Sequence, residues 1–179
     1  MLAHYTADQV GSMIGYLPQR VELFDGTVAD NISRFRADAS SEAIIMAATA
    51  AGVHDLISAL PDGYNSRVGE QGDLLSAGQR QRIGSAQALY GDPFLIVLDE
   101  PNSNLDAEGD VALTDAIHQA RNRGSVVIVI AHRPSAIAAV DSLLYMQGGR
   151  QAVYGPKNEV LQKITQSGSN VHPIKAPTS

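Results

Sequence analysis

Three side chains that can do chemistry follow two apolar runs of the chain. Asp99 and Glu100 come directly after one run, and His132 comes shortly after the next. If both runs are parallel strands, their carboxyl ends meet at one edge, where ligands bind in open sheets. Asp99 can then bind Mg²⁺ through oxygen, Glu100 can take a proton from water, and His132 can donate to a phosphate. The set predicts hydrolysis of a phosphate compound, although a single acidic strand end or a lone histidine is often incidental.

A second group, Ser76, Ala77, Gly78 and Gln79, stands at the expected start of a helix. Free N–H groups and the helix dipole make such a start a site for anions. Ser76 can add a hydroxyl group, and Gly78 lets a phosphate approach the backbone. The alternative interpretation is an ordinary N-cap, in which Ser76 satisfies one amide and does nothing more. The two arginines of the first turns, at positions 80 and 82, either belong to a working surface or are solvated or paired with acids.

Two further polar residues occupy positions of the same kind. Gln19 follows a short apolar strand, so its amide oxygen can ligate Mg²⁺ or a water, or it is simply a polar loop residue. Asp106 follows a turn containing Pro101; it can cap the next helix and still serve a site across an interface. The other histidines lack such a setting and are expected to be surface or core residues: His4, His54, His118 and His172.

The sequence lacks a glycine-rich lysine loop for phosphates. Its lysines are Lys157, Lys163 and Lys175, and none is followed by serine or threonine. Such a loop supplies a lysine and a row of N–H groups to the phosphates of a nucleotide. We therefore expect the chain by itself to bind a nucleotide weakly or not at all.

Composition limits the classes of protein that fit. The 179 residues, 44% hydrophobic and 18% charged, suit one globular domain, or one domain with a subdomain. A net charge of −6 and a pI near 5.2 argue against a general surface for nucleic acids. The absence of cysteine excludes disulfides and thiolate zinc sites. No apolar run approaches the roughly 20 residues that a membrane span needs, and the first residues do not resemble a signal peptide.

The pattern of apolar residues predicts an α/β fold with a parallel sheet flanked by helices. Strands are expected over 13–17, 94–98 and 126–130, and the runs 94–98 and 126–130 are apolar enough to be covered on both faces. The region 26–75 is expected to be helical and without a strand. Helices are expected over 27–32, 42–51, 54–60, 77–90, 107–123 and 158–166, a hairpin over 142–154, and a mobile tail over 167–179.

These residues resemble the nucleotide-binding domain of ABC transporters over about residues 5–165. Residues 14–19, 75–79 and 99–106 look most like the ATPases of type I secretion systems, which export proteins from Gram-negative bacteria. Ala77 replaces a more common glycine, and residues 85–87 depart from the usual Ala/Leu-Ala-Arg run. The matching motifs are the Q-loop at Gln19, the pre-signature segment at 68–72, the signature at 75–79, Walker B at 95–100, the D-loop at 103–106 and the H-loop at His132.

The resemblance implies an incomplete P-loop NTPase core. The Walker A loop is missing, so the chain looks like the C-terminal piece of a longer protein. Without the Walker A strand and helix, we expect the Walker B strand to lose a neighbour and apolar surface to favour self-association. The expected parts are a truncated core with the Q-loop over 1–25, a helical subdomain over 26–90, a core with Walker B, D-loop and H-loop over 91–166, and the tail.

The resemblance also implies the ligands and partners. ATP and Mg²⁺ would bind between two copies arranged head to tail, with Ser76, Ala77, Gly78 and Gln79 on the nucleotide of the partner copy. Glu100, His132, Gln19 and Asp106 would be catalytic, and Asp99 with Gln19 would hold the metal. Residues 20–24 and those around Glu70 would touch the transmembrane domain, at the cytoplasmic face of the inner membrane. Further partners would be the membrane fusion and outer-membrane secretion components. Nucleic acid is not expected as a partner.

Two other interpretations stay open. The first is a soluble DNA-repair or chromosome-organising ATPase, which also carries signature and Walker B motifs. It usually adds heptad segments or zinc sites, and neither is visible in this sequence. The second is a non-catalytic interaction module from a truncated gene, in which the motifs persist without activity.

Overall fold

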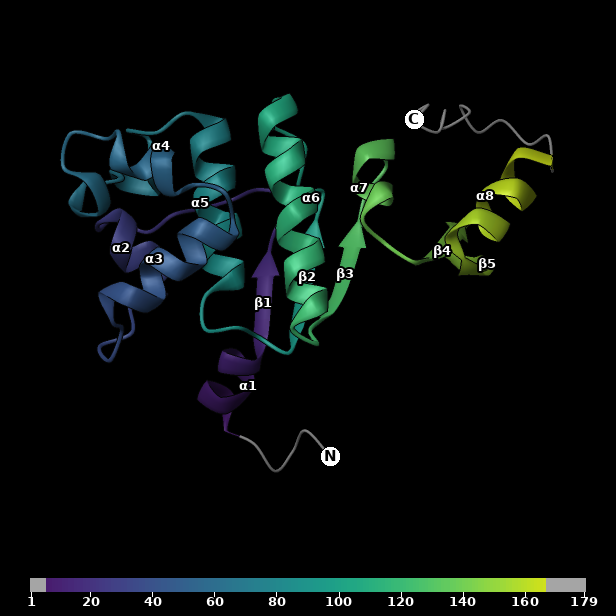
Figure 1. The fold of residues 1–179 in the computed structure, drawn as a ribbon, viewed down its shortest axis with the longest axis horizontal. Helices are drawn as coiled ribbons and strands as arrows, with labels where there is room; N and C mark the ends of the chain where they lie inside the picture. The colour runs from purple at the N-terminus through teal and green to yellow at the C-terminus, as the bar shows by residue number, and fades with distance from the viewer. Residues whose placement is uncertain (1–5, 167–179) are drawn as a thin grey trace.

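A three-stranded parallel sheet forms the centre of the protein (Figure 1). The structure is a computed structural model that describes residues 6–166. Its strands are β1 (Ile14–Leu17), β2 (Leu95–Asp99) and β3 (Val126–Ile130), in the order β1-β2-β3. Leu17 pairs with Leu98, and Asp99 pairs with Ile130. The carboxyl ends of all three strands therefore meet at one edge, and the positions of the predicted strands are confirmed to within one residue.

The region before β2 is mainly helical, as predicted. Thr27, Ser40 and Ser76 act as N-caps, and each side chain accepts a hydrogen bond from the backbone three residues further on. Gly52 has a φ of +64° and follows the end of α3. The elements are α1 (Ala7–Met13), α2 (Val28–Ile32), α3 (Ser41–Ala50), α4 (His54–Ser58), the 3₁₀ turns Gly63–Asn65 and Glu70–Gly72, and α5 (Ala77–Leu89).

The region after β2 begins with the long helix α6 (Ala107–Asn122) and ends in a separate unit. Helix α7 (Pro134–Ala138) follows β3 and was not predicted. The predicted hairpin is confirmed as β4 (Ser142–Gln147) and β5 (Arg150–Pro156), which are antiparallel, and α8 (Lys157–Gln166) packs on it. Figure 1 shows this unit at one end of the molecule, apart from the parallel sheet. The predicted tail 167–179 lies outside the described residues.

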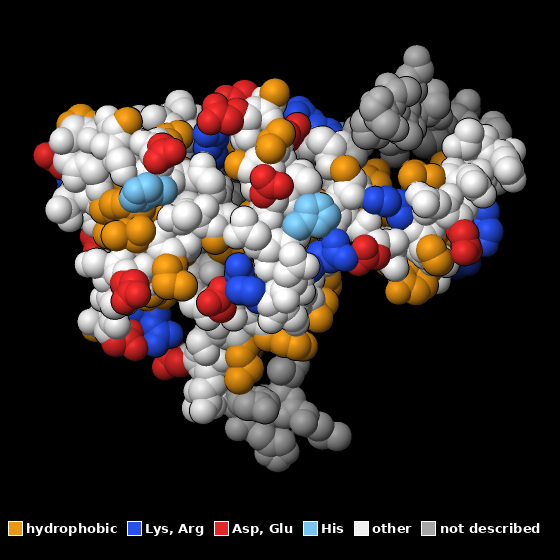
Figure 2. All heavy atoms as spheres, viewed as in Figure 1, with side chains coloured by type: hydrophobic (Ala, Val, Ile, Leu, Met, Phe, Trp, Pro, Cys, Tyr) orange, Lys and Arg blue, Asp and Glu red, His pale blue; other side chains and the backbone are white. Residues whose placement is uncertain are grey.

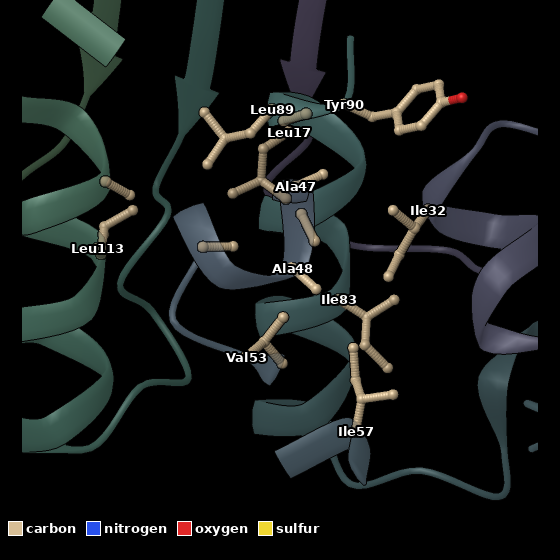
Figure 3. Packing of buried hydrophobic residues seen from close by; sticks show 14 of the residues in the cluster. Leu17, Ile32, Ala47, Ala48, Val53, Ile57, Ile83, Leu89, Tyr90 and Leu113 are labelled. Carbon is tan, nitrogen blue, oxygen red and sulfur yellow. The ribbon is translucent and has the colours of Figure 1, made fainter. Parts of the chain in front are cut away.

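The core lies between the helices that precede β2 and one face of the sheet. Ile32, Ile57 and Ile83 come from three different helices and are completely buried (Figure 3). Gly15 explains why β1 can lie so close to α5: a Cβ built there would stand 1.9 Å from the carbonyl oxygen of Ala88. A side chain at position 15 would therefore force the strand and the helix apart.

The prediction that the runs 94–98 and 126–130 are covered on both faces is wrong. On β3, Val126, Ile128 and Ile130 are 47%, 47% and 52% exposed, while the residues between them are half-buried. Phe94, which we expected to begin a covered strand, is 65% exposed. The alternation arises because successive side chains point to opposite faces, and α5 and α6 pack on one of those faces. Tyr16 on β1 is likewise 53% exposed.

The expectation that the Walker B strand loses a neighbour is also wrong. β2 is the central strand and is hydrogen-bonded to both β1 and β3, so the edges of the described sheet belong to β1 and β3. Figure 2 shows apolar side chains at the surface below the sheet and on the hairpin unit. No helix within residues 6–166 has the length and apolarity required to cross a bilayer.

Candidate functional site

Glu100 and His132 lie side by side at the edge where β2 and β3 end. The Nδ1 atom of His132 stands 3.3 Å from a carboxylate oxygen of Glu100, and their side chains are 67% and 26% exposed. The N–H group of Glu100 donates to the carbonyl of Ile130 at 2.8 Å, which fixes the loop after β2 to the end of β3. The sequence predicted that these two side chains come together, and the structure confirms their proximity.

Glu100 has a left-handed backbone, with a φ of +47°. For a residue other than glycine this conformation costs about 1–2 kcal/mol, so neighbouring contacts must hold it. Its N–H group is bound as described above, and its carbonyl accepts from the N–H group of Ser103 at 3.1 Å. The following Pro101 disfavours the right-handed helical region at Glu100 but favours an extended conformation, so no local signal predicted the left-handed one. Side chains along β2 alternate between the two faces of the sheet. The left-handed conformation of Glu100 lets its side chain depart from that alternation.

Asp99 and Gln19 lie at the same edge of the sheet. Asp99 is the last residue of β2 and is half-buried, and Gln19 is exposed two residues beyond the end of β1. Within the described residues no three histidine or acidic side chains form a ready-made metal site. Mg²⁺ commonly uses one or two protein oxygens, with phosphates and waters as its other ligands. The donor set at this edge therefore fits Mg²⁺ only when a phosphate compound is also bound.

The tip of α5 is a capping box. The Ser76 hydroxyl accepts from the Gln79 N–H group at 3.2 Å, and the Gln79 amide oxygen accepts from the Ser76 N–H group at 2.8 Å. Ser76 is therefore the N-cap of α5. Ser76 and Ala77 are exposed and Gly78 is half-buried, and no hydrogen bond to the N–H groups of Ala77 or Gly78 occurs among residues 6–166. These two amides remain able to meet an anion.

The arginines after the tip have structural contacts. Arg80 donates to the carbonyls of Gly72 and Leu75, at 3.1 and 2.6 Å. Arg82 pairs with Asp106 at 2.6 Å, as one of the two alternatives foresaw. Asp106 also caps α6 by accepting from the Gly109 N–H group at 2.9 Å. The hydrogen bond from this N–H group, and to a smaller extent the Arg82 guanidinium, lowers the pKa of Asp106. The carboxylate therefore stays ionised at the tip of the helix.

Sequence reasoning missed a set of polar residues behind this edge. Gln81 and Asn102 are 1% and 2% exposed, and both are hydrogen-bonded. Arg133 donates to the carbonyl of Asn102 at 3.0 Å. The polar run 79–82 concealed which side chain points inward, because helical spacing alone does not show what packs on a helix. Buried polar side chains need partners, and here the partners come from distant parts of the chain.

Known proteins are similar to this chain in sequence. A family model described as ABC transporter matches residues 2–103. The type I secretion system ATP-binding protein PrsD of Rhizobium meliloti (strain 1021) is 60% identical over 163 residues, which are 91% of this chain and 28% of that protein. A mitochondrial potassium channel ATP-binding subunit of Rattus norvegicus is 42% identical over 86% of this chain and 21% of its own length.

Solved structures agree with the sequence comparisons. A bacterial Atm1-family ABC exporter with ATP bound has a TM-score of 0.81 and 34% identity, and the match covers 90% of this chain and 28% of that one. The chain thus spans less than a third of the length of the relatives it matches. Its α/β architecture is the ABC ATPase fold. The family match over more than half of the residues, with the parallel strands and the polar edge described above, shows that this chain belongs to the ABC transporter family.

Proposed function

We propose that this chain supplies catalytic and signature residues of an ATP-hydrolysing domain in an ABC exporter. The observation that carries the proposal is the contact between Glu100 and His132 at the carboxyl ends of adjacent strands, 3.3 Å apart. A carboxylate and an imidazole in contact at such an edge can hold a water between them and an incoming phosphate. The proximity of both to Asp99 at the end of β2 adds the oxygen ligand that a phosphate-bound cation needs.

Each residue has a role in this proposal. Glu100 orients the attacking water and accepts its proton, and His132 donates to the γ-phosphate and holds the Glu100 carboxylate in place. Asp99 and Gln19 would hold Mg²⁺, and the bound cation would neutralise charge that develops on the phosphates. Asp106 fixes the start of α6 through Gly109 and meets the partner copy.

The tip of α5 serves a second copy of the domain. Because the N–H groups of Ala77 and Gly78 lack a partner within the described chain, they can bind phosphate oxygens that approach from outside. Ser76 and Gln79 shape that tip through the capping box. The proposal is a head-to-tail dimer in which each ATP lies between Glu100 of one copy and the α5 tip of the other.

The proposal requires a phosphate-binding loop from polypeptide outside these 179 residues. We refer to this chain joined to that loop as the complete domain. The chain alone should bind ATP weakly, because its sequence contains no glycine-rich lysine loop. Titration of the isolated chain with ATP measures this directly. Micromolar affinity accompanied by turnover would show that the loop is not required.

The assembly proposed around the domain is an exporter for proteins. The 60% identity to PrsD, a type I secretion ATP-binding protein, supports this choice over other exporters. Residues 20–24 and the 3₁₀ turn Glu70–Gly72 would contact a transmembrane domain at the cytoplasmic face of the inner membrane. Membrane fusion and outer-membrane components would complete the export path.

The substitution Glu100→Gln in the complete domain tests the proposed chemistry. It keeps the size of the side chain but removes the proton acceptor, so we expect turnover to fall by at least about a hundredfold while ATP binding is retained. The control is Glu159→Gln, which makes the same change on the exposed first turn of α8. Unchanged turnover in Glu100→Gln would remove Glu100 from this role.

A further inference from the structure

The loop between β2 and α6, residues 101–106, is held from two sides. Pro101 and Asn102 are buried although they lie between a strand end and an exposed helix tip. Each carbonyl from residue 100 to residue 103 accepts a hydrogen bond. A loop so fully bonded has little freedom to move by itself. The position of Glu100, at its start, depends on the groups that donate these bonds.

Helix α5 holds the first side of this loop. The amide nitrogen of Gln81 donates to the carbonyl of Pro101 at 3.0 Å, and the whole Gln81 residue is 1% exposed. Arg82 holds the far end of the loop through Asp106. Helix α5 and the 101–106 loop also approach each other closely at Gly78, where a Cβ would stand 3.2 Å from the carbonyl oxygen of Asn104.

The segment after β3 holds the second side. Arg133 donates to the carbonyls of Asn102 and Ser103, at 3.0 and 3.4 Å. The Asn102 side chain donates to the hydroxyl of Ser135 at 2.7 Å. His132 immediately precedes Arg133, so one short segment carries both the imidazole and the arginine that donates to the loop carbonyls. Glu100 and His132 are therefore connected through the 101–106 loop as well as directly.

We infer that Gln81 is a positioning residue for Glu100. Proline has no N–H group, so its carbonyl is the one backbone polar group of Pro101, the residue next to Glu100, to which a neighbour can hydrogen-bond. The buried amide group of Gln81 donates a hydrogen bond to that carbonyl. It thereby steadies the left-handed conformation of Glu100, whose own N–H group donates to the carbonyl of Ile130. The inference rests on the proposed function, because it concerns the aim of the Glu100 carboxylate during hydrolysis.

The test compares two identical substitutions on α5 in the complete domain. Gln81→Leu removes the donor to Pro101, and Gln87→Leu makes the same change at a half-buried position whose side chain makes no hydrogen bond among the described residues. A misplaced catalytic group costs up to about a hundredfold in rate. We expect Gln81→Leu to lower kcat by about ten- to a hundredfold, with KM for ATP nearly unchanged, and Gln87→Leu to leave both unchanged.

A second measurement separates positioning from a loss of structure. If Gln81 acts through Glu100, Gln81→Leu should have little further effect on single-turnover hydrolysis in the Glu100→Gln background. Equal losses in both backgrounds, or a kcat unchanged by Gln81→Leu, would overturn the inference while leaving the role of Glu100 intact. If Glu100→Gln itself leaves turnover unchanged, the proposed function fails instead. Loss of ATP binding in Gln81→Leu would also count against a positioning role.

Discussion

Two regions of this protein both carry large apolar side chains but differ sharply in the burial of those side chains. In the helical region before β2, Ile32, Ile57 and Ile83 are completely buried. On β3 and the hairpin unit, Ile128 and Leu144 are 47% and 53% exposed. The difference shows that an apolar pattern indicates only which side chains would be stabilised by burial. Whether they are buried depends on which other elements pack against that segment.

The candidate site lies at the boundary of these regions. The 101–106 loop is held by Gln81 from the helical region and by Arg133 from the segment after β3. Glu100 stands at the start of that loop. The well-packed region therefore supplies a rigid support, and the open region carries His132, the residue that we propose meets the ligand.

The largest expected effect comes from the same substitution made in both regions. Ile83→Ala removes a fully buried side chain and should lower the free energy of unfolding by about 3 kcal/mol. Ile128→Ala, on the exposed side of β3, should cost less than about 1 kcal/mol in this chain. Urea unfolding of both variants measures the contrast. Equal losses would mean that β3 is as well covered as the helical core.

The complete domain would sharpen this contrast. If further polypeptide covers β3 there, the cost of Ile128→Ala should rise toward that of Ile83→Ala, because the methyl groups lost would then be buried ones. An unchanged small cost would show that the outer face of β3 stays in solvent.

A smaller effect is expected from Arg34, which joins the helical region to the sheet. Its guanidinium donates to the carbonyls of Gln87, Gly11 and Ile14, at 2.9–3.1 Å. Its burial lowers the pKa of the guanidinium, which stays charged. Arg34→Met should cost about 2 kcal/mol, because carbonyls that are partly buried lose their donors. Arg20→Met, at an exposed arginine near Glu22, is the control and should change stability by less than about 0.5 kcal/mol.

The smallest effect concerns the cap of α2. Thr27→Ala removes the acceptor for the Asp30 N–H group and should cost about 1 kcal/mol by thermal unfolding. The Thr27 N–H group, and next its hydroxyl, lower the pKa of Asp30. A lowered folded-state pKa contributes stability that is present above the unfolded value, about 3.9, and is lost as pH falls through the folded value. The stability gap between Asp30→Asn and the unsubstituted chain should therefore shrink as pH falls below about 4.

The sequence was sufficient for the positions of the elements other than α1 and α7, and for the contact between Glu100 and His132. Apolar runs located the strands, and threonine and serine caps located the helix starts. The meeting of Glu100 with His132 followed from the rule that parallel strands end at one edge. The helix 134–138, the open face of β3 and the inward turn of Gln81 depend on contacts between distant segments. The pattern of residues within one segment does not indicate such contacts.

Gly15 shows how far a backbone constraint can act from where it lies. The hydrogen atom in place of a side chain sets the spacing between β1 and α5, because any larger group would meet the Ala88 carbonyl. Gln19 is four residues further along the same segment, roughly 13 Å away in extended chain. A genetic screen for loss of activity could therefore recover substitutions at a position that has no functional group to lose.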